Sequence, residues 1–344
     1  ITISEAMFAD MKDSMLINFR NSKLAQADAQ ARAYGRKLMK QKPHYDSELE
    51  AALVSATLDD VKSFANELYA KTFMTGSAYG NWNDADVQTA VDKLRKGVQS
   101  APLPANKRPS VKIDIPVAGQ HPVFSTAVKN NNNAFREYKF LGKATPETEV
   151  AMNIVSTMIA NDFFVELRTK RQLGYSVGQF SQKLKGELLS GFLIQSGNYG
   201  PSLLDSETQK WKKEHAIQII RNMPEAMFDQ YKMGLMNQYQ SKPNSTEEMH
   251  GYLFGAVEEQ DSNFNYLEDL QNALQALTKE QVVAMAEKML LDESLPAVTL
   301  HMLGMDNKES AVPGAITCEN PASGTDPAVT AWVRNKVCDP QGPQ

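Results

Sequence analysis

The sequence has few histidines and cysteines, no excess of basic charge and no long apolar run, and each shortage excludes a class of function. No two of its five histidines stand four positions apart, which excludes the H-x-x-E-H arrangement of two zinc ligands and a glutamate base on one helical face. The five are His44, His121, His215, His250 and His301. Lys and Arg number 36 against 41 Asp and Glu, for a net charge of −5, and the basic residues are dispersed. The chain therefore lacks the basic face that nucleic-acid binding requires.

The absence of a long apolar run bounds the class of protein. No run approaches the roughly 18 residues that suggest a transmembrane helix, so we expect no membrane span. A hydrophobic share of 42% and a charged share of 22% are typical of a globular domain. At 344 residues the chain is long enough for two domains and a sizeable core without metals. It opens on Ile1 within a helical pattern, and we interpret it as beginning in the middle of a longer protein.

The two cysteines, Cys318 and Cys338, lie 20 residues apart in a Pro/Gly-rich C-terminal segment. Without C-x-x-C spacing or nearby histidines they do not form a zinc site. They either stay unpaired or form a disulfide in an oxidising compartment, such as a periplasm or the secreted space. We favour the disulfide, because nothing else in this segment could tie it to the body of the protein.

The chain contains an internal repeat. MFADMKDSMLINF at 7–19 matches MFDQYKMGLMNQY at 227–239, an offset of 227 − 7 = 220. Further matches lie one position later in register: Tyr45 with Tyr266, Thr57 with Thr278, Val61 with Val282, and Ala65 with Ala286. Each copy predicts a long helix, a second helix, a short connector, a third helix and a strand. Similarity over this length indicates a duplicated domain rather than a solenoid.

The two copies are unequal. A strand-rich stretch at 112–196 precedes the later copy, whereas the earlier copy starts at residue 1. Because a helical layer must bury its apolar stripe against another layer, we expect upstream residues to supply the sheet of the first copy. This is an independent reason to interpret the chain as a fragment.

Periodicity predicts an α+β fold, in which an antiparallel-rich sheet is covered by helices on one face. Thr57 and Thr145 are predicted helix caps, and Pro146 takes the first position of its helix. A hairpin is expected around Lys185-Gly186. The predicted helices span 4–39 with breaks, 57–71, 84–99, 145–164, 201–221, 224–240, 245–259, 267–274 and 278–290. The predicted strands span 111–117, 121–129, 134–141, 175–181, 188–196 and 297–303, and residues from 304 on are expected to be a tail.

Arg168 and Tyr175 are the main candidate site residues. They lie in the segment FFVELRTKRQLGYSV at 163–177, where Gly174 indicates that the helix ends before Tyr175. Both side chains then project from a helix-to-strand corner. A guanidinium and a phenol can donate hydrogen bonds to a peptide carbonyl or a developing oxyanion. The alternative is structural: an arginine that complements a helix dipole and a tyrosine half-buried in a sheet.

Other candidates are weaker. His215 follows Glu214 on a helix without a ligand four residues away, which favours a solvent-exposed face. His250, with Glu258 and Glu259 two turns on, is better explained as part of a surface helix. His44, with Asp46 and Glu48, lies at a connector where polar side chains cap helix ends. The glycines at 186, 191 and 197 do not form a phosphate loop. The 16 methionines are most simply explained as residues that fill the core.

The segment FFVELRTKRQLGYSV resembles F-x-x-L-R-T-K-E-Q-L-G-Y of the insulinase/pitrilysin family of zinc metallopeptidases. GFLIQSGNYGPSLLDS resembles the strand-to-helix passage that follows in the family, and LTKEQVVAMAEKML resembles its last helix. The resemblance covers about residues 112–305. Arg171 stands where the family usually has Glu. Because of the resemblance, we expect 1–100 to be the helical C-terminal part of a third homologous domain, 101–110 a linker, 111–305 a fourth domain, and 306–344 a tail with the cysteine pair.

The resemblance implies a peptidase of four homologous domains whose two halves close around a chamber. Zinc and H-x-x-E-H belong to the first domain, so we expect zinc in the full-length protein and none in this chain. Arg168 and Tyr175 would bind the peptide substrate and help stabilise the tetrahedral intermediate. The expected partners are peptide substrate and the N-terminal catalytic half, with neither nucleic acid nor a membrane span. A periplasmic or secreted location is expected.

Two other functions stay open at this stage. The chain could come from a catalytically dead homologue that acts as a binding or assembly subunit of an active peptidase. The retained Arg168 and Tyr175 count mildly against this, because a structural subunit need not keep both. A free-standing peptide-binding module is disfavoured by the truncated first copy.

Overall fold

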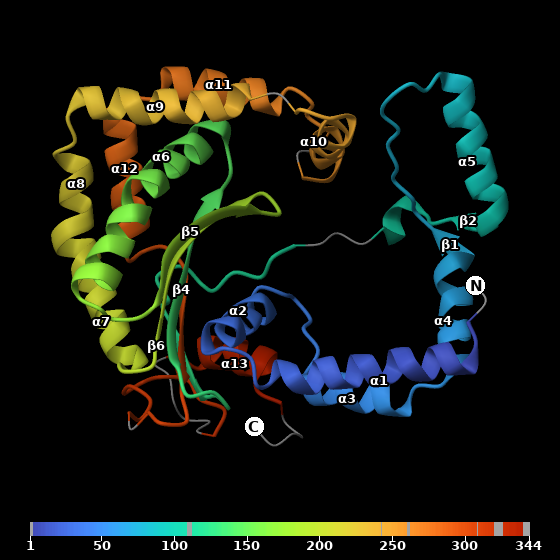
Figure 1. The fold of residues 1–344 in the computed structure, drawn as a ribbon, viewed down its shortest axis with the longest axis horizontal. Helices are drawn as coiled ribbons and strands as arrows, with labels where there is room; N and C mark the ends of the chain where they lie inside the picture. The colour runs from blue at the N-terminus through green and yellow to red at the C-terminus, as the bar shows by residue number, and fades with distance from the viewer. Residues whose placement is uncertain are drawn as a thin grey trace. The chain divides into compact units, whose positions relative to one another are not determined.

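The computed structural model describes residues 3–108, 112–241, 243–259, 262–307, 309–319 and 326–339. The chain divides into two compact units. Unit 1 consists of Ile1–Ile17, Glu50–Val111 and Ser241–Tyr266, and unit 2 of Asn18–Leu49, Lys112–Gln240 and Leu267–Gln344. Figure 1 traces the elements that make up each unit. The domain boundaries expected from the sequence stay a prediction.

Unit 2 is built on a mixed five-stranded sheet in the order β3-β7-β4-β6-β5. Its strands are β3 (Val123–Ala127), β7 (Ala297–Leu303), β4 (Asn133–Lys143), β6 (Glu187–Ser196) and β5 (Ser176–Leu184). The β3–β7 pair is parallel and the others are antiparallel. The β5–β6 hairpin turns at Lys185 and Gly186, which both have positive φ, as a tight primed turn requires. The predicted α+β class and this hairpin are confirmed.

One predicted strand is wrong. Residues 112–117 form no strand in the described part of the chain, and residue 111 lies outside it. Ile113 makes an isolated bridge with Lys40, and the Asp114 N–H donates to the carbonyl of Met39 at 2.8 Å. Trp332 donates to the Asp114 carboxylate at 3.1 Å. The segment therefore bonds to the end of one helix and the side chain of another instead of to a strand.

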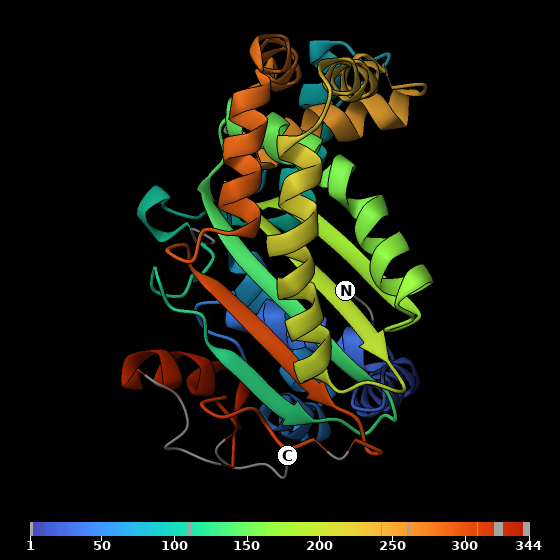
Figure 2. The same ribbon diagram turned by 90° about the vertical axis from the view of Figure 1, so that its left-hand side faces the viewer.

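One face of the sheet carries the helices that the sequence predicted (Figure 2). They are α6 (Pro146–Phe163), continued by the π-helical turn η2 (Phe164–Lys170); α7 (Pro201–Trp211), continued by η3 (Lys212–Ala216) and α8 (Ile217–Arg221); and α12 (Lys279–Leu290). The helix α9 (Glu225–Gln240) packs against α6, and α11 (Tyr266–Ala276) precedes α12 in the chain. Phe163 packs against Trp211 and Phe192, with ring centroids 4.8 and 4.9 Å apart. The predicted cap at Thr145 is confirmed, with Pro146 in the first turn.

The opposite face of the sheet is also covered, although the sequence predicts helices on one face only. The helices α2 (Ala27–Leu38) and α13 (Pro327–Val337) pack there (Figure 1). The reason lies in β4, where every residue from Asn133 to Leu141 is buried. Alternate side chains of a strand point to opposite faces, so this continuous burial requires a layer on each side.

The segment beyond Gly304 is more than the predicted tail. It contains α13, whose Val329, Val333 and Val337 enter the core beneath α2. The expected disulfide between Cys318 and Cys338 is confirmed. The helix attaches this segment to the core of unit 2, and the disulfide closes a loop within the segment.

The element order of the repeat is the same in both copies, as the sequence predicts, but a further helix stands in each copy where the sequence predicts a short connector. The first copy runs α1 (Glu5–Ser22), α2, α3 (Asp46–Ser55), α4 (Leu58–Ala70) and β1 (Lys71–Thr72). The second runs α9, α10 (Thr246–Glu259), α11, α12 and β7. The second helices of the two copies belong to different units: α2 lies in unit 2 and α10 in unit 1.

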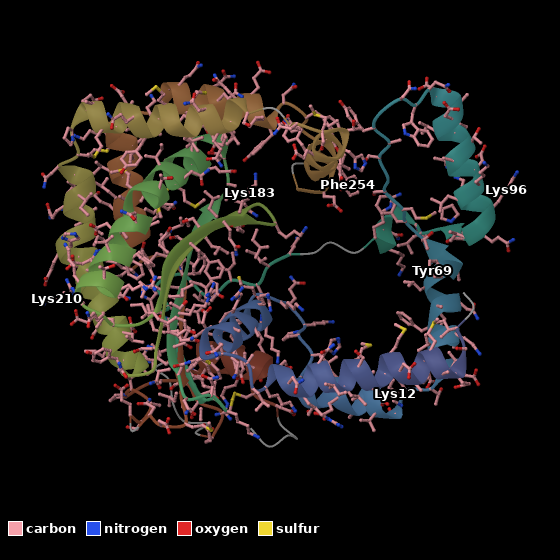
Figure 3. The ribbon with its side chains drawn as sticks, viewed as in Figure 1. Lys12, Tyr69, Lys96, Lys183, Lys210 and Phe254 are labelled. Carbon is pink, nitrogen blue, oxygen red and sulfur yellow. A yellow bond between two sulfur atoms is a disulfide. The ribbon has the colours of Figure 1, made fainter. Side chains whose placement is uncertain are left out.

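Unit 1 has little buried core of its own. It includes α4, α5 (Asp84–Val98), α10, η1 (Ala105–Lys107) and the two-stranded parallel pair β1–β2 (Ala101–Pro102). Lys12, labelled in Figure 3, donates to the carbonyls of Val54 and Ala56 at 2.7 and 2.8 Å and so caps the end of α3. Among the described residues of this unit, Leu58 and Ala256 are the buried ones.

The helix from Pro146 to Lys170 is long and apolar enough to cross a membrane by length and composition, and half of its apolar stretch is buried inside the protein. Its buried residues face the sheet and the neighbouring helices of unit 2. We therefore interpret it as a core helix.

Candidate functional site

The site is formed where η2 turns into β5. The Arg171 N–H donates to the Glu166 carbonyl at 3.0 Å, and the Leu173 N–H to the Leu167 carbonyl at 2.9 Å, which closes the helix with wide turns. Gln172 adopts a positive φ of 54°, as residues that end helices often do. The prediction that the helix ends before Tyr175 is confirmed.

Gly174 is required by a close backbone contact. A Cβ atom at this position would lie 2.2 Å from the carbonyl oxygen of Gln195 on β6. No side chain fits in that space, so only glycine lets the corner lie flat against β6. The contact places Tyr175 beside Gln195, where β5 begins at Ser176.

Tyr175 is exposed at the surface of this corner but its hydroxyl is anchored. The side chain is 59% exposed, and its oxygen accepts a hydrogen bond of 2.8 Å from Nε2 of Gln195. Gln195 is 2% exposed and also bonds to α2: its Oε1 accepts from the Asp28 N–H at 2.9 Å, and its Nε2 donates to Gln26 at 3.2 Å. Asn132 donates to the same Gln26 oxygen at 2.9 Å. The phenol is thus connected to the first turn of α2.

Arg168 is exposed on the last turn of η2. Its guanidinium lies over the ring of Phe164, 4.7 Å from the centroid. Within the part of the chain that the structure describes, it makes no hydrogen bond or ion pair. Its five donors are therefore free to bind an external acceptor.

The acidic neighbour of Arg168 is occupied by other cations. Glu166 accepts from Lys170 at 2.8 Å and from Arg171 at 3.3 Å. The hydrogen bond from Lys170 is the main reason that the pKa of Glu166 is lowered. Arg171, where the family usually has Glu, also pairs with Glu207 of α7 at 2.6 Å. Glu166 is thus paired with Lys170 and Arg171, and Arg168 has no carboxylate partner among the described residues.

The histidine candidates do not gather around Arg168 and Tyr175. His215 pairs with Asp162 at 3.0 Å, and His250 bonds to Ser77 at 2.7 Å and stacks on Phe254. No group of three or more His, Cys, Asp or Glu side chains that could hold a metal occurs among the described residues.

The remaining sequence candidates have structural roles. Near His44, Glu48 accepts from the Tyr45 N–H at 3.0 Å, which caps α3. A Cβ at Gly191 would lie 2.1 Å from the carbonyl oxygen of Glu137, so this glycine serves packing within the sheet.

Three residues around Tyr175 were not predicted from the sequence: Gln195, Gln26 and Asp28. One signal was present, because Gln195 interrupts the apolar strand GFLIQS and a buried amide in such a strand needs partners. The partners themselves lie on α2, more than 160 residues away in sequence, so no local pattern could identify them.

Comparisons with known proteins show similarity to insulinase-family peptidases in sequence and in fold. The family model described as PQQ synthase PqqF-like, C-terminal lobe domain 4, matches residues 154–253. The chain is 23% identical over 318 residues to the insulin-degrading enzyme of Drosophila melanogaster, covering 90% of this chain and 32% of that protein. The chain therefore spans about a third of the length of this curated relative.

Two solved structures share the fold. A crystal structure of pitrilysin superposes with a TM-score of 0.79 at 18% identity, covering 97% of this chain and 35% of that chain. The peptidase M16 inactive domain from Pseudomonas fluorescens superposes with a TM-score of 0.64 at 19% identity, covering 90% of this chain and 72% of that chain.

Proposed function

Because this chain is a relative of the C-terminal half of insulinase-family peptidases, we propose that it is the non-catalytic part of a zinc metalloendopeptidase. In this proposal the chain forms part of the wall of a closed chamber that admits unfolded peptides. The observation that carries the proposal is the η2–β5 corner, which presents the exposed Arg168 and Tyr175 from a rigid sheet edge.

The proposed role of Arg168 and Tyr175 is to bind the scissile carbonyl and its transition state. Peptide hydrolysis turns the carbonyl oxygen into an oxyanion in the tetrahedral intermediate, and preorganised donors stabilise that charge. The unpaired guanidinium of Arg168 and the anchored hydroxyl of Tyr175 are donors of this kind. Removing one such donor typically costs about 10²-fold or more in rate.

The described residues of this chain do not fit a zinc site. We propose, as the resemblance to insulinase-family peptidases implies, that the zinc ligands and the general base lie in the N-terminal half of the full-length protein. In that half, zinc would polarise the carbonyl and activate the attacking water.

The repeat supports packing of the first copy against a further layer. Phe64 and Leu68 of α4 are 64% and 52% exposed, whereas Met285 and Met289, at the matching positions of α12, are 6% and 1% exposed. The second copy buries these positions against α6 and the sheet. The same positions of the first copy would be covered in the complete protein.

The disulfide supports an oxidising location. Disulfides such as Cys318–Cys338 persist in periplasmic or secreted proteins and are rare in the cytosol. We propose that the protein is periplasmic or secreted.

A second candidate function is that of a dead homologue that binds or assembles with an active peptidase. The structural likeness to an inactive M16 domain, which this chain covers over 72% of its length, favours it. An intact H-x-x-E-H motif in the full-length protein would exclude it.

Cleavage of a quenched unstructured peptide by the full-length protein tests the proposal. Tyr175→Phe and Arg168→Ala are each expected to lower kcat/KM by about 10²-fold. Tyr79→Phe is the matched control, because Tyr79 is 42% exposed in unit 1, and it should leave the rate unchanged. Wild-type rates for both site variants would contradict the proposed role.

A further inference from the structure

Gln195 lies where its side chain can fix the orientation of the Tyr175 hydroxyl. It lies on β6 between Ala134 of β4 and Ser176 of β5, and its side chain points to the face covered by α2. It is 2% exposed, so its amide must find hydrogen-bond partners within the protein.

The orientation of the Gln195 amide follows from its partners. A backbone N–H can only donate, so the atom 2.9 Å from the Asp28 nitrogen is the amide oxygen. The amide nitrogen then points to Tyr175 at 2.8 Å and to Gln26 at 3.2 Å. Both of its hydrogens are used.

This orientation sets the direction of the bond to Tyr175. An amide nitrogen donates and does not accept, so the phenol oxygen is the acceptor. The hydroxyl proton of Tyr175 is not used in this bond, and among the described residues the hydroxyl has no other hydrogen-bond partner. The proton is therefore available to a ligand at the exposed side of the ring.

The residues that hold Gln195 in place are themselves fixed by further contacts. Asp28 binds Gln195 through its backbone, and its carboxylate pairs with Arg136 of β4 at 2.9 Å. The Arg136 side chain is 8% exposed and also donates to Tyr138 at 2.7 Å. The first turn of α2 is thereby fixed to the sheet, and Gln195 is held between the two.

We propose that Gln195 is a positioning residue that holds the Tyr175 hydroxyl as an acceptor, so that its proton points to the peptide carbonyl. This inference rests on the proposed function of Tyr175. Gln195 does not touch the substrate. It acts by preorganising a donor, which is how protein dipoles lower the free energy of an oxyanion.

Gln195→Glu is the sharpest test, because it reverses the bond to Tyr175, keeps the bond from the Asp28 N–H and removes the bond donated to Gln26. One carboxylate oxygen still accepts from the Asp28 N–H. The other accepts from Tyr175, which turns the hydroxyl proton into the protein. In the full-length enzyme we expect kcat/KM to fall by about 10²-fold, as for Tyr175→Phe, with the loss mainly in kcat. Gln195→Met removes both the donor and the acceptor at similar volume and should also lower kcat/KM.

A double-mutant cycle separates positioning from a structural role. In the Tyr175→Phe background, Gln195→Glu should change kcat/KM by less than about twofold, because the hydroxyl it acts on is absent. A loss that persists in that background would show that Gln195 acts through α2 or the sheet, and would overturn the inference. Thermal unfolding of each variant identifies any that fails to fold, and the cycle is then closed with Gln195→Met.

The two proposals fail in different ways. If Tyr175→Phe lowers the rate and a folded Gln195→Glu variant keeps wild-type activity, the positioning role is wrong and the proposed function stands. If Tyr175→Phe has wild-type activity, both the proposed role of Tyr175 and the positioning role are wrong.

Discussion

Gly35 of α2 offers a direct test of how this helix is fixed to the sheet. A Cβ added at Gly35 would lie 2.5 Å from Cε2 of Tyr138 and 2.6 Å from its Cζ and hydroxyl. The Tyr138 ring cannot easily withdraw, because it packs edge-on against Phe180 at 5.4 Å and its hydroxyl accepts from Arg136 at 2.7 Å. Gly35→Ala should therefore push α2 away from the sheet.

Two effects oppose each other in Gly35→Ala. Replacing glycine by alanine within a helix lowers backbone entropy in the unfolded chain and typically stabilises by about 0.5–1 kcal/mol. Overpacking a well-filled core costs about 1–3 kcal/mol. Because Gly35 and Tyr138 are both buried, we expect the clash to win. The free energy of unfolding should fall by about 0.5–2 kcal/mol.

Gly234→Ala is the matched control. Gly234 lies within α9, and a Cβ there meets nothing within 4 Å. The same substitution should therefore raise the free energy of unfolding by about 0.5–1 kcal/mol. Urea denaturation of both variants measures the difference. Equal stabilisation by the two substitutions would refute the close packing of α2 on Tyr138.

Two further predictions concern stability. Reducing the disulfide, or replacing Cys318 and Cys338 by serine, should lower the free energy of unfolding by about 3 kcal/mol, because a loop of 20 residues is released in the unfolded chain. Thermal melts with and without reductant measure this effect, and an unchanged melting temperature would contradict it. Glu166 has a lowered pKa in the folded state, so its contribution is complete above its unfolded pKa of about 4.3 and is lost as the pH falls through the folded value. Stability measured between pH 6 and 2 should accordingly fall less steeply for Glu166→Gln than for the wild type, and parallel curves would count against this contribution.

Local features of the fold could be predicted from the sequence. The caps at Thr57 and Thr145 form between residues three positions apart, so the residue types alone indicate them. The end of the helix at Gly174 is also indicated by the residue type alone, which is why the exposed positions of Arg168 and Tyr175 follow from the motif; the contact of Gly174 with Gln195 on β6 is not local and could not be predicted.

The position of α2 on the sheet could not be predicted, because the contacts that fix it join residues distant in sequence. Asp28 pairs with Arg136, 108 residues away, and its N–H bonds to Gln195, 167 residues away. Periodicity shows that a helix has an apolar stripe and does not show which sheet covers it. For the same reason the sequence assigned helices to one face of the sheet only.

The central claim is that this chain supplies binding and transition-state help and not the hydrolytic centre. The most direct measurement is cleavage of a quenched unstructured peptide by the purified 344-residue chain, with and without a metal chelator. We predict no cleavage by the chain alone, and cleavage that depends on Tyr175 in the full-length protein. Chelator-sensitive cleavage by the chain alone would place a catalytic metal site within these residues and contradict the account.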